Sequence, residues 1–173
     1  MSDGDWSDYV ASAGPDPAAL EGVAGDMGDA TAAISPDLES IDTTALPGDA
    51  AGDVASAQYG AGEAASWDQW AQGDLANSAS WQDQAAGDVQ QAQQWAAFGD
   101  MDAAQESLDS ASTASGIAGE AAGDAQTHLG IGAEYLVGAS GDLSAAAGSV
   151  GYDPGSVDAG SDAGSVDSGS DAG

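Results

Sequence analysis

No lysine or arginine occurs anywhere in this chain, and that absence limits how the chain can fold. Thirty Asp and Glu residues give the 173-residue sequence a formal net charge of −30 at pH 7. Ordinary composition would place on the order of 15–20 Lys and Arg residues in a chain of this length. Because no such cation offsets the carboxylates, a compact state must depend on counterions and on buried apolar area.

The charge also indicates which partners to expect. Nucleic acids are bound through cationic side chains that neutralise phosphates, and this chain has none to offer. Anionic membrane surfaces should repel it for the same reason. We therefore expect the partner to be a basic protein surface or further copies of the chain, and neither nucleic acid nor an anionic membrane.

The apolar residues predict an all-α fold with a thin core. Hydrophobic residues make up 42% of the chain, but most are Ala, and only five Trp, four Tyr and one Phe are large aromatics. At about 25 cal/mol per Å² of buried apolar area, such a core is marginal without help from partners or ions.

Four segments differ in composition. Residues 1–17 are acidic and end in a Gly-Pro-Asp-Pro helix-entry signal. Residues 18–49 combine a weak Ala-rich helix over 18–34 with a loop over 35–49 that contains Pro36 and Pro47. Residues 50–147, rich in Ala, Gln and Ser, form the predicted helical domain. Residues 148–173 hold a nine-residue Gly/Ser/Asp repeat made twice, which predicts a disordered tail.

A 14-residue quasi-repeat begins at Trp67, Trp81 and Trp95. Fourteen residues are close to four helical turns, so the three side chains would share one face of a continuous helix. However, Gly is preferred just past a helix end and Asp at a helix start, so the Gly-Asp pairs at 73–74, 87–88 and 99–100 indicate interruptions. We favour short helices of about 11–13 residues, joined by Gly-Asp turns into helical hairpins or a small bundle.

Five aromatic residues form the candidate site: Trp67, Trp70, Trp81, Trp95 and Phe98. Aromatic side chains are enriched at the centres of protein interfaces, so this set could be a partner-binding stripe. In a chain so poor in large apolar residues, the simpler interpretation is that each helix buries its aromatic side chain against the next. Both interpretations hold if the array is a single layer of helices.

Two short segments resemble known families. The run Gly99-Asp100-Met101-Asp102-Ala103-Ala104 is similar to the turn and second helix of a tetratricopeptide repeat, which would imply a protein-binding scaffold. The 26-residue step from Gly73 to Gly99 departs from that family's 34-residue period. Tyr59 and Glu63 match the Tyr-x-x-x-Glu export signal of actinobacterial type VII secretion substrates, although the Trp-x-Gly turn of that family is absent.

The sequence predicts no catalytic, cofactor or metal site. His128 is the single histidine, and there are no cysteines, so a zinc site or a thiol nucleophile is not expected. The tail repeat resembles calcium-binding nonapeptides but lacks their doubled glycine, so we expect weak association with divalent cations and no more.

These observations predict a non-enzymatic, acidic, helical structural or interaction protein that belongs to a larger assembly, such as a virion or surface particle. The alternatives are a DNA-mimic inhibitor of a basic nucleic-acid-binding protein and a halophilic or exported helical protein. No signal peptide or transmembrane segment is recognisable, so we expect synthesis as a soluble cytoplasmic chain, with packaging into a particle and export as open alternatives.

Overall fold

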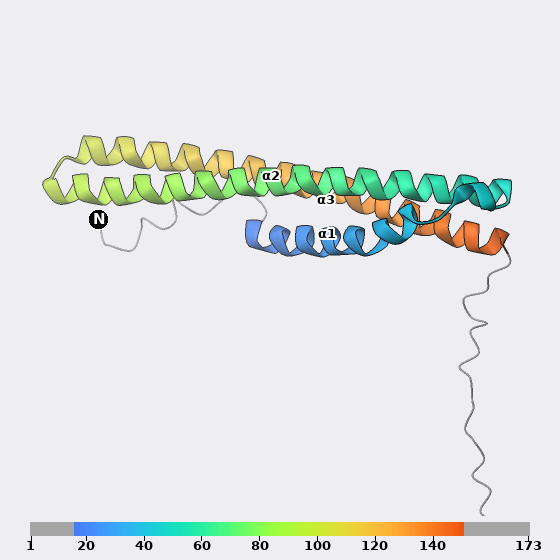
Figure 1. Ribbon diagram of the computed structural model, residues 1–173. Helices are drawn as coiled ribbons and strands as arrows, with labels where there is room; N and C mark the ends of the chain where they lie inside the picture. Colours follow the sequence, from blue (N-terminus) through green and yellow to red (C-terminus); the bar gives the residue numbers. More distant parts are fainter. Residues whose placement is uncertain (1–15, 151–173) are drawn as a thin grey trace, which may run out of the picture.

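The fold is an antiparallel hairpin of two very long helices with a third helix against one half of it (Figure 1). The computed structural model describes residues 16–150. It contains α1 (Pro17–Glu39), the short 3-10 helix η2 (Thr43–Ala45), α2 (Gly48–Phe98) and α3 (Met101–Ser149). No strand occurs among these residues, so the predicted all-α class is confirmed. Most of the acidic segment 1–17 and of the predicted tail lies outside the described residues.

A seam of small side chains holds α2 and α3 together. Every seventh residue of each helix is small and buried. In α2 these residues are Ala50, Ala57, Ala64, Ala71, Ser78, Ala85 and Ala92, and in α3 they are Ala104, Ala111, Ala118, Ala125, Gly132, Ala139 and Ala146. A second series, offset by three or four residues, completes a heptad pattern typical of coiled coils. It includes Val54, Leu75 and Val89 in α2 and Leu108, Ala122 and Leu129 in α3.

The small residues let the two backbones approach closely. A Cβ atom added at Gly60 would lie 3.1 Å from the carbonyl oxygen of Tyr135 and 3.3 Å from the Cβ of Ala139. Near the middle of the seam, the hydroxyl of Ser78 donates a hydrogen bond of 2.8 Å to the carbonyl of Ala118 on the facing helix. Packing in the seam therefore depends on backbone proximity more than on large apolar side chains.

Only one of the three Gly-Asp pairs expected to interrupt the helices does so. Gly99 has φ +82°, a left-handed conformation that favours glycine, and Asp100 caps α3 by accepting a hydrogen bond from the N–H of Ala103. The pairs at 73–74 and 87–88 lie inside α2. The prediction of helices of about 11–13 residues was therefore wrong, and the resemblance to tetratricopeptide repeats does not extend to the fold.

Helix α2 continues through Gly73 and Gly87 because the residues that follow each Gly-Asp pair pack into the seam with α3. A glycine inside a helix costs about 1 kcal/mol relative to Ala. Ending α2 at Gly73 or Gly87 would interrupt the buried seam, whose stabilisation comes from tertiary packing rather than from local propensity.

Helix α1 follows the same heptad spacing and turns half of the hairpin into a three-helix bundle. Its buried residues are Leu20, Ala24, Met27, Thr31 and Leu38. The first three pack with residues of both long helices, namely Ala71, Leu75, Ala122, Ala125 and Leu129. The helix ends at Glu39, beyond the predicted limit of 34, because Pro36 stands in its last turn and removes only one backbone hydrogen bond there.

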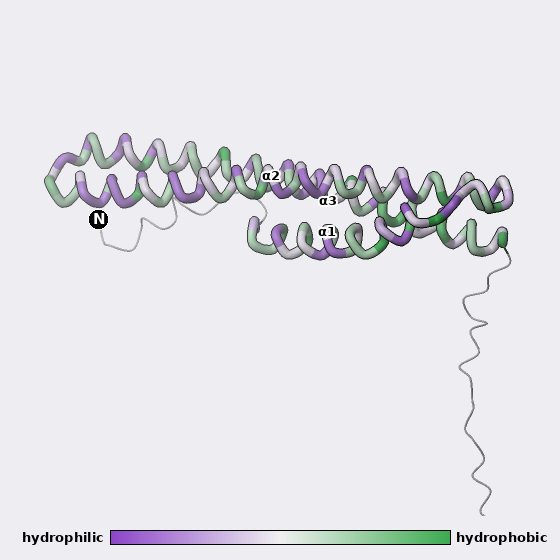
Figure 2. The backbone as a smooth tube through the Cα atoms, in the orientation of Figure 1, coloured by the Kyte–Doolittle hydropathy of each residue, from purple (hydrophilic) through white to green (hydrophobic). Residues whose placement is uncertain are grey.

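In the other half of the hairpin, towards the connection at Gly99, the described residues 16–150 contribute α2 and α3 alone (Figure 1). The core of this half is a small cluster formed by Val89, Ala92, Leu108 and Ala111. Hydrophilic and hydrophobic residues alternate along every helix (Figure 2). No helix in the described part of the chain is both long and apolar enough to span a lipid bilayer.

Candidate functional site

The five predicted site residues lie on α2, but most of them are not core residues. Trp67 and Trp81 are partly buried, whereas Trp95 is exposed and Trp70 and Phe98 are 66% and 81% exposed. The expectation that each aromatic side chain is buried against the next helix is therefore wrong for these three. A seam of Ala, Ser and Gly leaves no space for an indole or phenyl ring, so the rings lie at its edge or point away.

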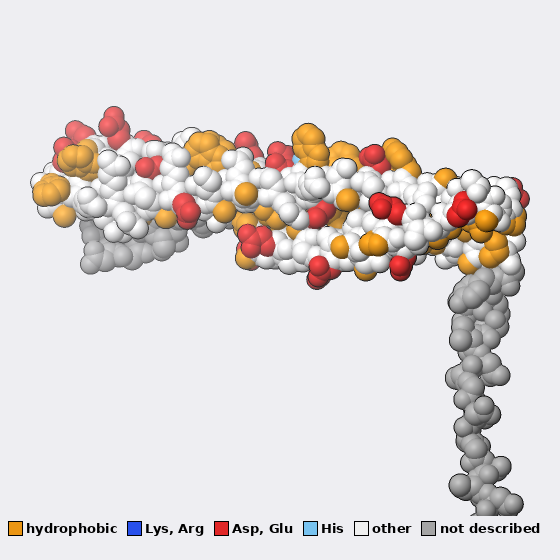
Figure 3. Space-filling view, viewed as in Figure 1, with side chains coloured by type: hydrophobic (Ala, Val, Ile, Leu, Met, Phe, Trp, Pro, Cys, Tyr) orange, Lys and Arg blue, Asp and Glu red, His pale blue; other side chains and the backbone are white. Residues whose placement is uncertain are grey.

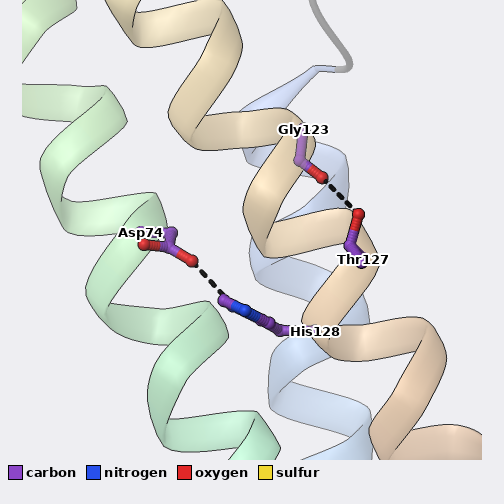
Figure 4. A network of polar contacts seen from close by, with 4 residues as sticks. All are labelled: Asp74, Gly123, Thr127 and His128. Carbon is purple, nitrogen blue, oxygen red and sulfur yellow. Dashed lines mark hydrogen bonds and ion pairs between the residues drawn. The ribbon is translucent and has the colours of Figure 1, made fainter.

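Trp67 and Trp70 instead surround the single histidine. The ring centroid of His128, on α3, lies 5.4 Å from that of Trp67 and 6.0 Å from that of Trp70. The carboxylate of Asp74 accepts a hydrogen bond of 2.8 Å from Nδ1 of His128 (Figure 4). This cluster joins α2 to α3 at the level where α1 also packs.

The His128–Asp74 pair resembles the base and orienting carboxylate of a catalytic triad, but the neighbouring hydroxyl is not directed at it. Thr127 donates its hydroxyl hydrogen bond to the carbonyl of Gly123, on the side of α3 away from Asp74 (Figure 4). A nucleophile would have to lie within hydrogen-bonding reach of the imidazole. The pair is therefore best described as a cross-helix hydrogen bond between partly buried side chains.

A second aromatic cluster lies at the hairpin tip. The rings of Trp95 and Phe98 meet edge to face with centroids 6.4 Å apart, and Met101 just beyond the connection is also exposed. Asp100 and Asp102 lie beside them, and the space-filling view shows apolar and acidic side chains together at this end of the molecule (Figure 3). We call Trp95, Phe98 and Met101 the tip cluster.

Sequence reasoning missed a buried carboxylate in the seam. Asp68 is only 6% exposed, and one carboxylate oxygen accepts a hydrogen bond of 2.8 Å from the side chain of Gln72. The other oxygen has no hydrogen-bond partner, and neither has the indole N–H of Trp67. Burial raises the pKa of Asp68. Gly28 of α1 lies directly over this carboxylate, since a Cβ there would be 3.2 Å from it.

Sequence reasoning also missed an open groove between α2 and α3. Its volume is about 670 Å³, and its lining includes Tyr59, Tyr135, Glu134 and Asp142 above a floor of Ala and Gly residues. The Tyr59–Glu63 pair, noted only as an export signal, was the one hint of it in the sequence. Within the described residues, no three His, Asp or Glu side chains come together to hold a metal ion.

No family model, curated protein or solved structure matches this chain. The candidate sites thus rest on the geometry alone: the tip cluster, the cluster of His128 with Trp67, Trp70 and Asp74, and the tyrosine-lined groove.

Proposed function

We propose that this chain is a non-enzymatic interaction protein, a stiff acidic arm that joins a larger assembly by contacting a basic protein surface. The observation that carries the proposal is the tip cluster at the end of the half without α1, where Phe98 is 81% exposed. Exposed aromatic side chains grouped on a soluble surface are typical of contacts with other proteins.

The charge of the chain supports a basic partner over self-association. Every copy carries a formal charge of −30 with no Lys or Arg, so two tips that approach each other repel. A partner with Lys and Arg around an apolar patch would be attracted to the acidic residues beside the tip cluster and would cover its rings.

The geometry favours the DNA-mimic alternative less. Helices α2 and α3 together carry 14 acidic residues. The hairpin is about 75 Å long, so there is roughly one carboxylate per 5 Å. Duplex DNA carries one charge per about 1.7 Å of its axis. Along one edge of α2, Trp67, Trp81 and Trp95 also alternate with Asp74 and Asp88, whereas a mimic would place carboxylates throughout.

Site-specific photo-crosslinking would test the proposal. A photoreactive phenylalanine analogue is placed at position 98 of the full chain, in the cells that make it. The matched control carries the same analogue at Val23, which is 51% exposed on α1 and far from the tip. We expect position 98 to give a discrete adduct with a basic protein and position 23 to give none.

Three results would count against the proposal. The first is no adduct from position 98, and the second is the same adducts from both positions. The third is an adduct formed only between copies of this chain, which would favour self-association instead.

A further inference from the structure

We infer that the groove between α2 and α3 beside Tyr59 and Tyr135 binds the ammonium or guanidinium group of a Lys or Arg side chain presented by a partner protein. This inference rests on the proposed function only for the basic character of the partner. The groove lies about 54 Å from the tip along α2, since 36 residues separate Tyr59 from Trp95.

The groove is open because its floor is made of residues with little or no side chain. Gly60 brings the α2 backbone close to the carbonyl of Tyr135, and a Cβ at Gly138 would meet nothing within 4 Å. Ala55 and Ala139 also line it. A long, thin side chain can therefore lie along the floor without displacing either helix.

Two tyrosine rings form its aromatic wall. The rings of Tyr59 and Tyr135 meet edge to face at a centroid distance of 6.4 Å and an interplanar angle of 75°. Tyr59 is 63% exposed, so a large part of its ring is open to a ligand. The negative face of an aromatic ring attracts organic cations within about 6 Å, and Arg most often.

Carboxylates supply the rest of the attraction. Glu134 and Asp142 belong to the lining, and Glu63 lies one helical turn from Tyr59. The negative charge of Glu63, followed by the influence of Tyr135, raises the pKa of Tyr59. Carboxylates form their strongest hydrogen bonds with cationic N–H donors.

The ligand must come from outside the chain, because the chain has no Lys or Arg of its own. An organic cation fits this lining better than a hard divalent ion, which prefers six or more oxygen ligands. Two rings and two lining carboxylates instead match the flat, delocalised guanidinium group, which stacks on aromatic faces and pairs with carboxylates.

The test is a fluorescence anisotropy titration of the full chain with a short, labelled peptide of alternating Arg and Gly residues, at about 0.15 M salt to suppress diffuse attraction. Two variants should raise the Kd for the peptide by about fivefold or more: Tyr59→Ala, which removes a ring, and Gly138→Leu, which fills the groove. Their matched controls are Tyr59→Phe, which keeps the ring, and Gly141→Leu, which adds the same side chain outside the lining. Both controls should stay within about twofold of the parent.

Charge needs its own control, because any lost carboxylate weakens a polyanion's attraction for a cationic peptide. Glu134→Gln removes a lining charge, and Glu120→Gln removes an exposed charge elsewhere on α3. We expect a markedly larger loss of affinity for the first. Thermal unfolding of each variant checks that the hairpin is intact.

The inference fails if the peptide does not bind saturably below about 1 mM. It also fails if Glu134→Gln and Glu120→Gln behave alike, or if Tyr59→Ala and Gly138→Leu leave the Kd unchanged. Tight binding of free tetramethylammonium with no gain from the peptide would assign the groove to a small molecule and overturn the proposal as stated. None of these variants alters the tip cluster, so this test and the crosslinking test at position 98 can fail separately.

Discussion

Replacing the buried carboxylate of Asp68 with an amide should stabilise the protein at neutral pH. Asp68 is 6% exposed, and one of its oxygens has no hydrogen-bond partner. Leaving a buried polar group unsatisfied costs about 1–3 kcal/mol, and more when the group is charged. Asn has nearly the same shape and can still accept the hydrogen bond from Gln72, but it carries no charge. We expect Asp68→Asn to gain about 1 kcal/mol at pH 7.

The gain should depend on pH in a definite direction. Burial raises the pKa of Asp68 above its ordinary value of 3.8. The native state therefore binds this proton more tightly than the unfolded chain does, and stability is lost as the pH rises through the raised pKa. The Asn variant does not titrate at this position. Its advantage should be full at pH 7 and should shrink as the pH falls through the raised pKa of Asp68.

Thermal unfolding followed by circular dichroism measures the effect. For a protein of this size, about 1 kcal/mol corresponds to a rise in Tm of about 2–4 °C. Asp83→Asn is the matched control, because it removes the same charge from an exposed position of α2. Equal gains in the two variants would show that relief of net charge explains the result. A lower Tm for Asp68→Asn at pH 7 would refute the reasoning outright.

Three further changes test the hairpin itself. Gly60→Ala should lower the free energy of unfolding by about 1–2 kcal/mol, because its Cβ would lie 3.1 Å from the carbonyl of Tyr135. Gly62→Ala faces open space and should raise the free energy of unfolding by up to about 1 kcal/mol. Urea unfolding compares the two variants, and equal effects would contradict the close approach of the helices at Gly60. Gly99→Ala should lower the free energy of unfolding by about 1–2 kcal/mol because Gly99 has a positive φ, while Gly87→Ala, inside α2, should raise the Tm. The opposite result would indicate that the turn lies at Gly87 and not at Gly99. Raising salt from about 0.01 M to 1 M should raise the Tm by screening the net charge of −30, and a Tm independent of salt would show that the repulsion is unimportant.

Local signals in the sequence predicted part of this fold correctly. The all-α class and the turn at Gly99-Asp100 were both readable, whereas the continuous helix that carries Trp67, Trp81 and Trp95 was the less favoured alternative. The continuity of α2 through Gly73 and Gly87 was not, because helix-stop signals act locally whereas the seam is formed by a helix far away in the sequence. The 14-residue repeat is two heptads, but Ala is so frequent in this chain that its seven-residue spacing does not stand out.

The candidate sites were harder to predict for a different reason. A carboxylate at a seam position contradicts the polarity pattern by which a buried face is recognised, so Asp68 was not identifiable as buried. The tyrosine-lined groove requires Tyr59 and Tyr135 to meet, and their contact depends on how α2 and α3 are aligned. The exposure of the tip cluster likewise depends on tertiary structure, because α1 packs only against the other half of the hairpin and does not cover the tip.

The short connection between α2 and α3 has a consequence for register. In many coiled coils, opposite charges beside the seam select one alignment of the helices, but a chain without Lys and Arg cannot use that device. Ala repeated every seven positions discriminates little against a slip of one heptad, so few contacts such as that of Ser78 with Ala118 depend on the alignment. Because only Gly99 and Asp100 join the helices, such a slip would require several helical residues to unwind. The turn thus carries the alignment information that charge pairs carry elsewhere, and lengthening it would let the two arms slide past each other.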